Sequence, residues 1–413
     1  MKFLQNIFDK LRPDFEKGGK FEKLYPLFEA NESFSFVTRN RTKSGAHIRD
    51  ALDTKRLMST VIVALIPCML FGIYNVGYQH FRAYGVADPA LMQCVIKGAW
   101  HVMPIIIVSY AVGGIWEVIF AVARKHEINE GFLVTGLLVP LTLPPTIPLW
   151  MVAAGVTFGV VIGKEVFGGT GMNVFNPALT ARAFIFFAYP AAISGDKCWR
   201  VVENTTFGAV DGTIVDGFSG ATPLLVASTT DTMAVTERLT EFGQATGYAD
   251  FSWAQSFVGL IPGSIGETSA LCCLIGAAIL LITGVGSARI MIGVLIGGVC
   301  MAVLLNAVSI KDPTSMLAIP VKQHLVYGGF MFGLVYMATD PVSAAQTAMG
   351  KWIYGFLVGF LAILIRTINP AYPEGMMLAI LFMNAFAPLI DYFVIAAHMK
   401  KRMRRSKEGQ AYA

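Results

Sequence analysis

Residues 57–77 read LMSTVIVALIPCMLFGIYNVG, a run without a single charged side chain. A helix needs about 20 consecutive apolar residues to cross the hydrocarbon core of a bilayer. This run is long enough to do so, and Lys55 and Arg56 stand immediately before it. Basic residues at such a boundary are typical of a cytoplasmic flank. The stretch therefore predicts a membrane-spanning helix whose preceding residues lie inside the cell.

Similar runs recur along the chain, which is 413 residues long, 55% hydrophobic and 14% charged. Soluble domains carry about 25% charged residues, so this composition indicates an integral membrane protein. The formal net charge of +5 says little about nucleic acid, because the basic residues cluster near membrane boundaries and report topology. We predict an all-α polytopic membrane protein with about ten transmembrane helices, at 57–77, 100–123, 131–146, 148–164, 177–191, 268–287, 289–307, 324–339, 352–367 and 376–397.

Charge places both ends of the chain on the inner side of the membrane. The extension 1–56 is rich in Lys and Arg, and the tail 398–413 is strongly basic. An even number of crossings satisfies both ends. Residues 57–191 then form a first membrane unit and 268–397 a second. The long polar stretch 192–267 between them falls on the outer side, in the periplasm of a bacterial inner-membrane protein.

The two membrane units share short motifs in the same order. Gly113 and Gly114 resemble Gly297 and Gly298. Proline motifs follow in each half: Leu143-Pro144-Pro145 and Asn176-Pro177-Ala178 in the first, Thr339-Asp340-Pro341 and Asn369-Pro370-Ala371 in the second. Five segments per half is an odd number, so the second copy must be inverted. Inverted repeats with broken helices are the usual architecture of transport proteins.

Charged residues inside the predicted spans are candidate functional groups, because each is costly to keep in hydrocarbon. Glu117 lies in the middle of its span and Asp391 lies within another, whereas Asp340 ends one. One interpretation is internal ion pairing or snorkelling to the interface. The other is oxygen ligands or gates for a hard monovalent cation, helped by backbone carbonyls freed at Gly or Pro. Lys164, Glu165 and Arg182 flank spans and carry the same two interpretations.

The glycine-rich stretch 168–177, GGTGMNVFNP, offers close backbone approach together with the amides of Asn173 and Asn176. A flat heteroaromatic ring needs that combination, although a broken helix that uses Gly for its geometry is an equal alternative. The stretch lacks the GK[ST] of a phosphate-binding loop.

The six cysteines form no CxxC pair, which leaves no recognisable zinc or four-cysteine iron–sulfur site within the chain.

The polar interruption contains DGFSGAT at 216–222. Small residues around Ser219 leave the Thr222 hydroxyl open, and Asp216 precedes it by six positions. A glycine-rich turn would use the same residue types. The stretch nonetheless closely resembles the flavinylation signature Asp-x-x-Ser-Gly-Ala-Thr. In that chemistry a flavin transferase joins FMN to the Thr hydroxyl as a phosphoester, on the outer side of the membrane. We expect the hydroxyl to lie on an open loop that a second enzyme can grip.

With these motifs in one chain, and with IPGSIGE (261–267) and NPAYPEGMMLAILF (369–382), the sequence resembles the B-subunit family of sodium-translocating NADH:quinone oxidoreductases. The resemblance runs along nearly the whole chain. It implies FMN on Thr222, a non-covalent riboflavin, ubiquinone as electron acceptor, and Na⁺ as the exported ion. It also implies partners: an NADH-oxidising flavin and iron–sulfur subunit, a periplasmic FMN subunit and small membrane subunits.

The resemblance also assigns roles to residues. It links Gly113 and Gly114 to the quinone site, and Glu29, Glu117, Asp340 and Asp391 to sodium passage. Asn173 and Asn176 are our own candidates for the riboflavin pocket. Rival hypotheses are the D subunit of the related Rnf complex, a non-redox channel or transporter of the same fold, and a scaffold subunit. The extension 1–56 favours the quinone-reductase subunit over the Rnf subunit, and DGFSGAT is unexplained by a non-redox transporter.

Overall fold

The computed structural model of the chain describes residues 2–16, 19–22, 25, 28–29, 32, 36, 54–125, 128, 131–202, 214, 218–229, 233–246, 250–309, 312–369, 372 and 375–411. All regular elements in these residues are helical. They are α1 (Lys2–Phe15), α3 (Thr54–Ala83), α4 (Leu91–Arg124), α5 (Gly131–Leu141), α6 (Leu149–Val161), η2 (Glu165–Phe167), α7 (Pro177–Ala188), α8 (Pro190–Ile193), α9 (Pro223–Ser228), α10 (Val235–Thr246), α11 (Trp253–Val258), α12 (Ala270–Ile282), α13 (Ala288–Val308), η4 (Met316–Ala318), α14 (Val321–Val326), α15 (Phe330–Phe332), η5 (Gly333–Met337), α16 (Ala348–Ile368) and α17 (Met376–Ala411).

Six helical stretches among the described residues are long and apolar enough to cross a membrane: α3, α4, Leu149–Phe167, α13, α16 and the Met376–Arg405 part of α17. Three more, α5, α7 and α12, are apolar but shorter. The one remaining expected span, 324–339, is divided among α14, α15 and the π-helical η5. The prediction of an all-α polytopic membrane protein is confirmed, while four of its ten spans are short or broken helices.

Proline and glycine explain the interruptions. α5 ends at Leu141, and Pro144, Pro145 and Pro148 keep the following residues out of a helix before α6 begins. Between α14 and α15, Gly328 and Gly329 take φ of +62° and +67°. Such left-handed backbone is readily available to glycine, so the helix breaks there. Broken helices at membrane depth free backbone groups and occur where they line cavities.

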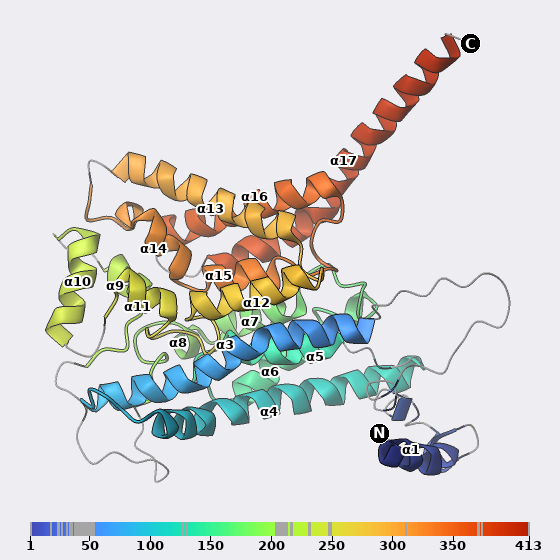
Figure 1. Cartoon of the computed structure of the whole chain (residues 1–413), viewed down its shortest axis with the longest axis horizontal. Coiled ribbons are helices and arrows are strands. Elements are labelled where there is room, and N and C mark those ends of the chain that lie inside the picture. Colours follow the sequence, from blue (N-terminus) through green and yellow to red (C-terminus); the bar gives the residue numbers. More distant parts are fainter. Residues whose placement is uncertain are drawn as a thin grey trace.

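The helices form two units that lie side by side (Figure 1). α3 of the first unit packs against α12 of the second. In the second unit, Gly297 on α13 and Gly359 on α16 bring the two backbones together, since a side chain at either position would meet the carbonyl oxygen of Phe356 or Val294. Small residues at helix crossings are the main device for packing helices in lipid, where apolar burial gives little drive.

The two units repeat a local packing arrangement. Gly113 on α4 lies against Phe132 of α5 and Val156 of α6, and Gly298 on α13 lies against Phe330 of α15 and Ile363 of α16. α4 runs toward the end of the bundle where both termini lie, whereas α13 runs away from it (Figure 1). This correspondence, with opposite helix direction, is what the expected inverted repeat requires.

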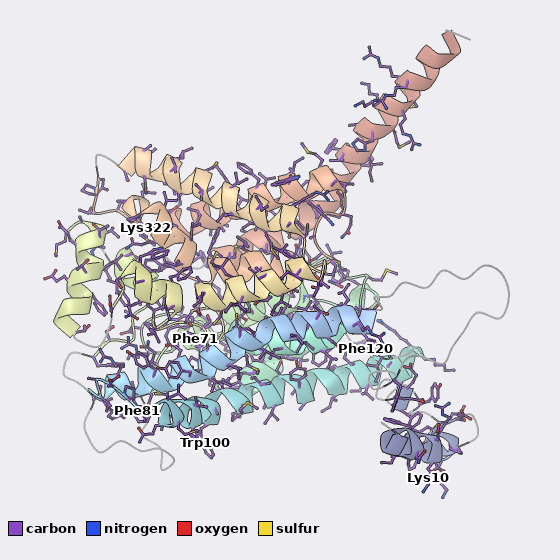
Figure 2. All side chains as sticks on the ribbon, viewed as in Figure 1. Lys10, Phe71, Phe81, Trp100, Phe120 and Lys322 are labelled. Atoms are coloured by element: carbon purple, nitrogen blue, oxygen red, sulfur yellow. The ribbon has the colours of Figure 1, made fainter. Side chains whose placement is uncertain are left out.

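Both chain termini lie at one end of the bundle, which we call the terminal side (Figure 1). α9, α10 and α11 lie at the opposite end, the loop side. Around the outside, large apolar side chains face away from the protein: Trp100 is 53% exposed, Ile107 59% and Val308 63%, and Figure 2 shows Trp100 projecting from α4. A surface of this kind suits lipid as its solvent.

Candidate functional site

Thr222 stands at the N-terminus of the short helix α9 on the loop side. Its side chain accepts a hydrogen bond from the backbone N–H of Leu225 at 3.3 Å, as an N-cap residue does. Ser219 makes a similar local contact, because its Oγ accepts from the N–H of Ala221 at 3.3 Å. Gly220 and Ala221 are buried and Thr222 is half-buried. Asp216, the first residue of the motif, lies outside the described residues.

The part of the loop that the structure describes, residues 218–222, is therefore packed rather than open on all sides. α9 shares a small hydrophobic core with α10 and with Met316, Ile319 and Tyr327. Arg238 of α10 clamps this layer by donating to the carbonyl oxygens of Ala227, Thr229, Met233 and Thr314. On the other flank, the guanidinium of Arg200 stacks over the ring of Phe218 at 5.5 Å.

Thr222 opens on a cavity of ≈ 270 Å³, which we call the loop-side cavity. Its walls come from α9, from the Gly/Pro-rich stretch 261–268 and from the break at Gly328 and Gly329. Most of the lining is apolar or backbone, and Glu267 is the one charged side chain among the described residues that line it. A ligand cavity of this kind combines apolar walls with a few placed polar groups.

Glu267 is held from behind by Arg182 of α7. Arg182 Nη1 lies 3.3 Å from Glu267 Oε1, and their side chains are only 4% and 7% exposed. The pair joins the two membrane units, because α7 belongs to the first and Glu267 precedes α12 of the second. Arg366 supports the lining residue Gly328 by donating to its carbonyl oxygen at 3.1 Å, and it also donates to the carbonyl oxygen of His324 at 2.9 Å.

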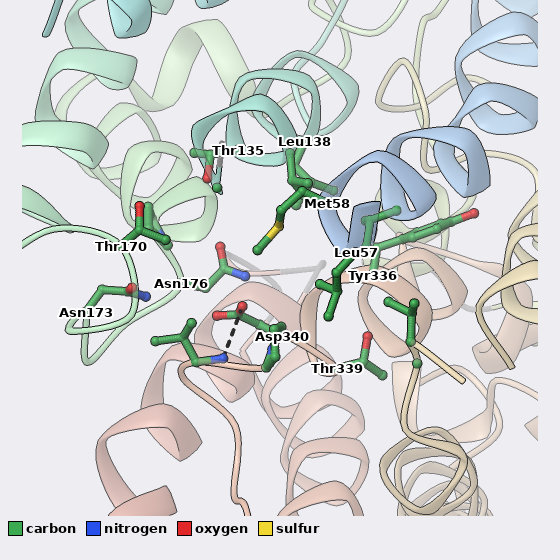
Figure 3. A pocket seen from close by; sticks show the side chains of 18 of the residues that line it. Leu57, Met58, Thr135, Leu138, Thr170, Asn173, Asn176, Tyr336, Thr339 and Asp340 are labelled. Carbon is green, nitrogen blue, oxygen red and sulfur yellow. Dashed lines mark hydrogen bonds between the residues drawn. The ribbon is translucent and has the colours of Figure 1, made fainter. Parts of the chain in front are cut away.

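A second cavity, the terminal-side cavity, lies between the units at the other end of the bundle. Figure 3 shows Asn173, Asn176 and Asp340 around it, with Leu57 and Met58 from the start of α3. Asn176 Oδ1 caps α7 by accepting from the N–H groups of Ala178 and Leu179. Asn173 Nδ2 donates to the carbonyl oxygen of Phe175 at 2.9 Å. The two asparagines predicted from the sequence thus line one space, of ≈ 70 Å³.

Asp340 faces this cavity and is partly engaged. Its carboxylate accepts from the hydroxyl of Ser343 at 2.5 Å and from the N–H of Ser343 at 3.3 Å. Lys164 and Thr170 line the same space. Lys164 in turn forms a buried ion pair with Glu117 and lies 3.4 Å from Glu165, which also pairs with Arg124 at 3.0 Å. Asp340 and the Lys164–Glu117 pair therefore flank one cavity.

The other two acidic candidates lie apart from it. Glu29 is buried, with Oε1 3.8 Å from Lys55 Nζ at the start of α3. Asp391 of α17 accepts hydrogen bonds from the N–H of Gln346, the N–H of Thr347 and the Thr347 hydroxyl, just before α16. Within the described residues, no three His, Cys, Asp or Glu side chains gather where they could hold a metal ion. Each of the four candidate carboxylates therefore has its own set of partners, and the described residues do not bring them together as the ligands of one ion.

The two glycines linked to the quinone site differ in their surroundings. Gly113 is buried against Phe132, so any side chain there would collide with the ring. Gly114 faces open space, with no atom within 4 Å of a Cβ built there.

Sequence reasoning gave Glu267 no role, although it ends the quoted motif IPGSIGE. Its signal was a lone carboxylate in a Gly/Pro-rich stretch beside a predicted span.

Comparison with known proteins identifies the family. A family model described as NQR2, RnfD, RnfE matches residues 41–400. The chain belongs to the NQR2, RnfD, RnfE family. Among its relatives, a Chromohalobacter salexigens protein named as the B subunit of a Na(+)-translocating NADH-quinone reductase is 48% identical over 97% of this chain and 96% of its own length. Proteins of the same name from Pseudomonas paraeruginosa and Azotobacter vinelandii are 47% and 48% identical over 98% of this chain and 99% of theirs.

Proposed function

We propose that this NQR2, RnfD, RnfE family member is the B subunit of a sodium-pumping NADH:ubiquinone oxidoreductase. In this role it carries electrons from a covalent FMN through riboflavin to ubiquinone, coupled to Na⁺ export. The identity of about half of all residues with relatives bearing that name, over nearly the full length of both chains, supports the assignment. Those relatives favour it over the Rnf subunit that the same family model includes.

The observation that carries the proposal is the position of Thr222. The residue that matches the flavin-attachment motif is also the residue that opens on the loop-side cavity. A phosphoester at its hydroxyl would tether FMN at the mouth of a largely apolar space whose walls include the backbone of Gly328 and Gly329, where no side chain stands in the way. Such walls suit a flat ring that needs close backbone approach and a few edge hydrogen bonds. Bound FMN would supply the electron-transfer chemistry, and this chain would supply its position and electrostatics.

For riboflavin we propose the terminal-side cavity. Asn176 uses its side-chain oxygen to cap α7, which leaves its NH₂ group to serve a ligand. Asn173 uses an N–H on Phe175 O, which leaves its side-chain oxygen as an acceptor. The donor and acceptor set fits the edge of a flavin. The space of ≈ 70 Å³ is narrow, so we expect Leu57 and Met58 to move aside when the ring binds.

For sodium passage there are four candidate carboxylates, Glu29, Glu117, Asp340 and Asp391. We propose that Asp340 is the one that takes part most directly. It is the one of the four that lines the terminal-side cavity, and hard cations prefer oxygen ligands. The coupling we propose is Coulombic: negative charge placed on a bound flavin by reduction attracts Na⁺. If sodium uptake by the complex were independent of flavin redox state, this coupling would fail.

The assignment implies a location and partners. Both termini would lie in the cytoplasm and the loop side would face the periplasm of a bacterial inner membrane. A flavin transferase would have to reach Thr222 before α9 packs. The NADH-oxidising subunit, the periplasmic FMN subunit and the small membrane subunits would complete the complex.

The test compares wild-type and Thr222→Ala complexes in membranes. We expect sodium-stimulated ubiquinone reduction by NADH to be lost in the variant. NADH oxidation with a soluble artificial acceptor should persist, because it needs only the NADH-oxidising partner. A Thr222→Ala complex that reduced ubiquinone at the wild-type rate would refute the proposed electron path.

A further inference from the structure

The loop-side cavity places one negative charge where a flavin on Thr222 would lie. Glu267 and Thr222 line the same ≈ 270 Å³, and the other described lining residues are uncharged. Glu267 is 8% exposed. A buried charge acts on its neighbours through a weaker dielectric than water, so its influence in this space is strong.

The position of the carboxylate is fixed from two directions. Arg182 holds it from the side of α7 at 3.3 Å. On the other side stands Gly329, where a Cβ would come within 2.9 Å of the carboxyl carbon and 3.0 Å of Oε2. The wall of the cavity thus approaches Glu267 as closely as a residue without a side chain allows. A carboxylate confined in this way is placed for an electrostatic role.

We propose that Glu267, positioned by Arg182, sets the reduction potential of the flavin attached at Thr222. This inference rests on the proposed function. Reduction adds negative charge to the flavin, and a fixed carboxylate in the same cavity opposes that charge. Arg182 has the opposite effect and also keeps the carboxylate oriented. Neutralising Glu267 therefore makes the flavin easier to reduce, and neutralising Arg182 makes it harder to reduce.

The experiment is a redox titration of the assembled complex, followed by flavin absorbance, with the Thr222→Ala complex as the baseline for the other flavins. We expect Glu267→Gln to raise the midpoint potential by at least about 59 mV, which is a tenfold change in a one-electron equilibrium. Glu267→Asp keeps the charge and should stay near wild type. Arg182→Gln should shift the potential downward.

Two further variants separate electrostatics from folding. The double variant Glu267→Gln with Arg182→Gln removes both charges, so the midpoint potential of the flavin should return toward the wild-type value. This variant can be measured in place of Arg182→Gln if the single variant does not assemble. Asp312→Asn is the matched control, because Asp312 is an exposed acid beyond α13 that does not line the cavity, and it should leave the potential unchanged.

The inference is overturned if Glu267→Gln leaves the potential at the wild-type value, or if both single variants shift it in the same direction. In-gel flavin fluorescence of each sample distinguishes the two claims. Wild-type protein without covalent flavin would overturn the proposed function and this inference together. Covalent flavin with an unmoved potential would overturn the role of Glu267 alone.

Discussion

The buried ion pair between Lys164 and Glu117 allows a quantitative test of what Glu117 does. Their side chains are 4% and 7% exposed, so neither charge is well solvated. Removing one partner of a buried pair costs about 3–5 kcal/mol, because the other charge loses its counter-ion in a poorly solvated position. The two members differ here in what they leave behind. Lys164→Met removes the cation that pairs with Glu117, while Glu165 keeps its ion pair with Arg124 at 3.0 Å. Glu117→Gln instead leaves Lys164 still facing Glu165 at 3.4 Å.

We therefore expect Lys164→Met to lower the free energy of unfolding by about 3–5 kcal/mol. Glu117→Gln should cost about 1.5–3 kcal/mol, the range for one hydrogen bond to a charged group. The double variant should cost less than the sum of the two. The assay is thermal denaturation of the purified complex, with retention of this subunit followed by gel. Glu237→Gln, at an exposed position of α10, is the matched control and should be neutral.

The same variants test whether Glu117 acts as a sodium ligand. If it did so without needing Lys164, Glu117→Gln would change the sodium dependence of turnover while leaving stability at the wild-type level. That result would refute the ion-pair account. Strict additivity of the two single losses would refute it as well, since contacting partners must show coupling.

Three further variants test other contacts. Asp391→Ala should cost about 0.5–2 kcal/mol, because it removes the acceptor for Gln346 N, Thr347 N and Thr347 Oγ1 before α16; thermal denaturation measures this, and an unchanged midpoint would contradict it. Gly329→Ala should lower the yield of assembled complex, because the residue has φ +67° and its Cβ would press on Glu267. Gly114→Ala is the control, since position 114 faces open space. Equal yields of the two variant complexes would refute the argument. Asn176→Asp should keep the cap on α7 but lose the NH₂ group, so riboflavin extracted per complex should fall while stability holds; loss of stability with full riboflavin content would reverse our assignment.

Hydropathy predicted the class of fold because the bilayer demands it. Uncharged runs such as 57–77 became α3, and the basic flanks placed both termini on one side. What hydropathy could not predict is where a span is continuous. Segment 324–339 carries no Asp, Glu, Lys or Arg and was predicted as a span, yet the paired left-handed residues Gly328 and Gly329 break it. Glycine is common in membrane helices, so its presence alone does not distinguish a crossing from a break.

Single residues of the candidate site could be predicted from the sequence, but their pairing could not. Asn173, Asn176 and Asp340 were each conspicuous in the sequence, and the structure brings them to one cavity. Glu117 was conspicuous too, but its ion partner Lys164 lies 47 positions away and the sequence could not pair them. The Arg182–Glu267 pair spans 85 positions and joins the two units. Contacts of that range depend on how the units pack, which no local pattern encodes.

The central claim is that Thr222 carries FMN, and mass spectrometry of the peptide containing residues 218–222 tests it most directly. The complex should be expressed together with a flavin transferase, and the denatured subunit should be assayed in parallel for in-gel fluorescence. We predict a peptide heavier by the mass of FMN less one water, with the modification on Thr222, and a fluorescent band that disappears in Thr222→Ala. An unmodified peptide from a non-fluorescent wild-type subunit would contradict the account and leave the loop-side cavity without the cofactor for which we propose it.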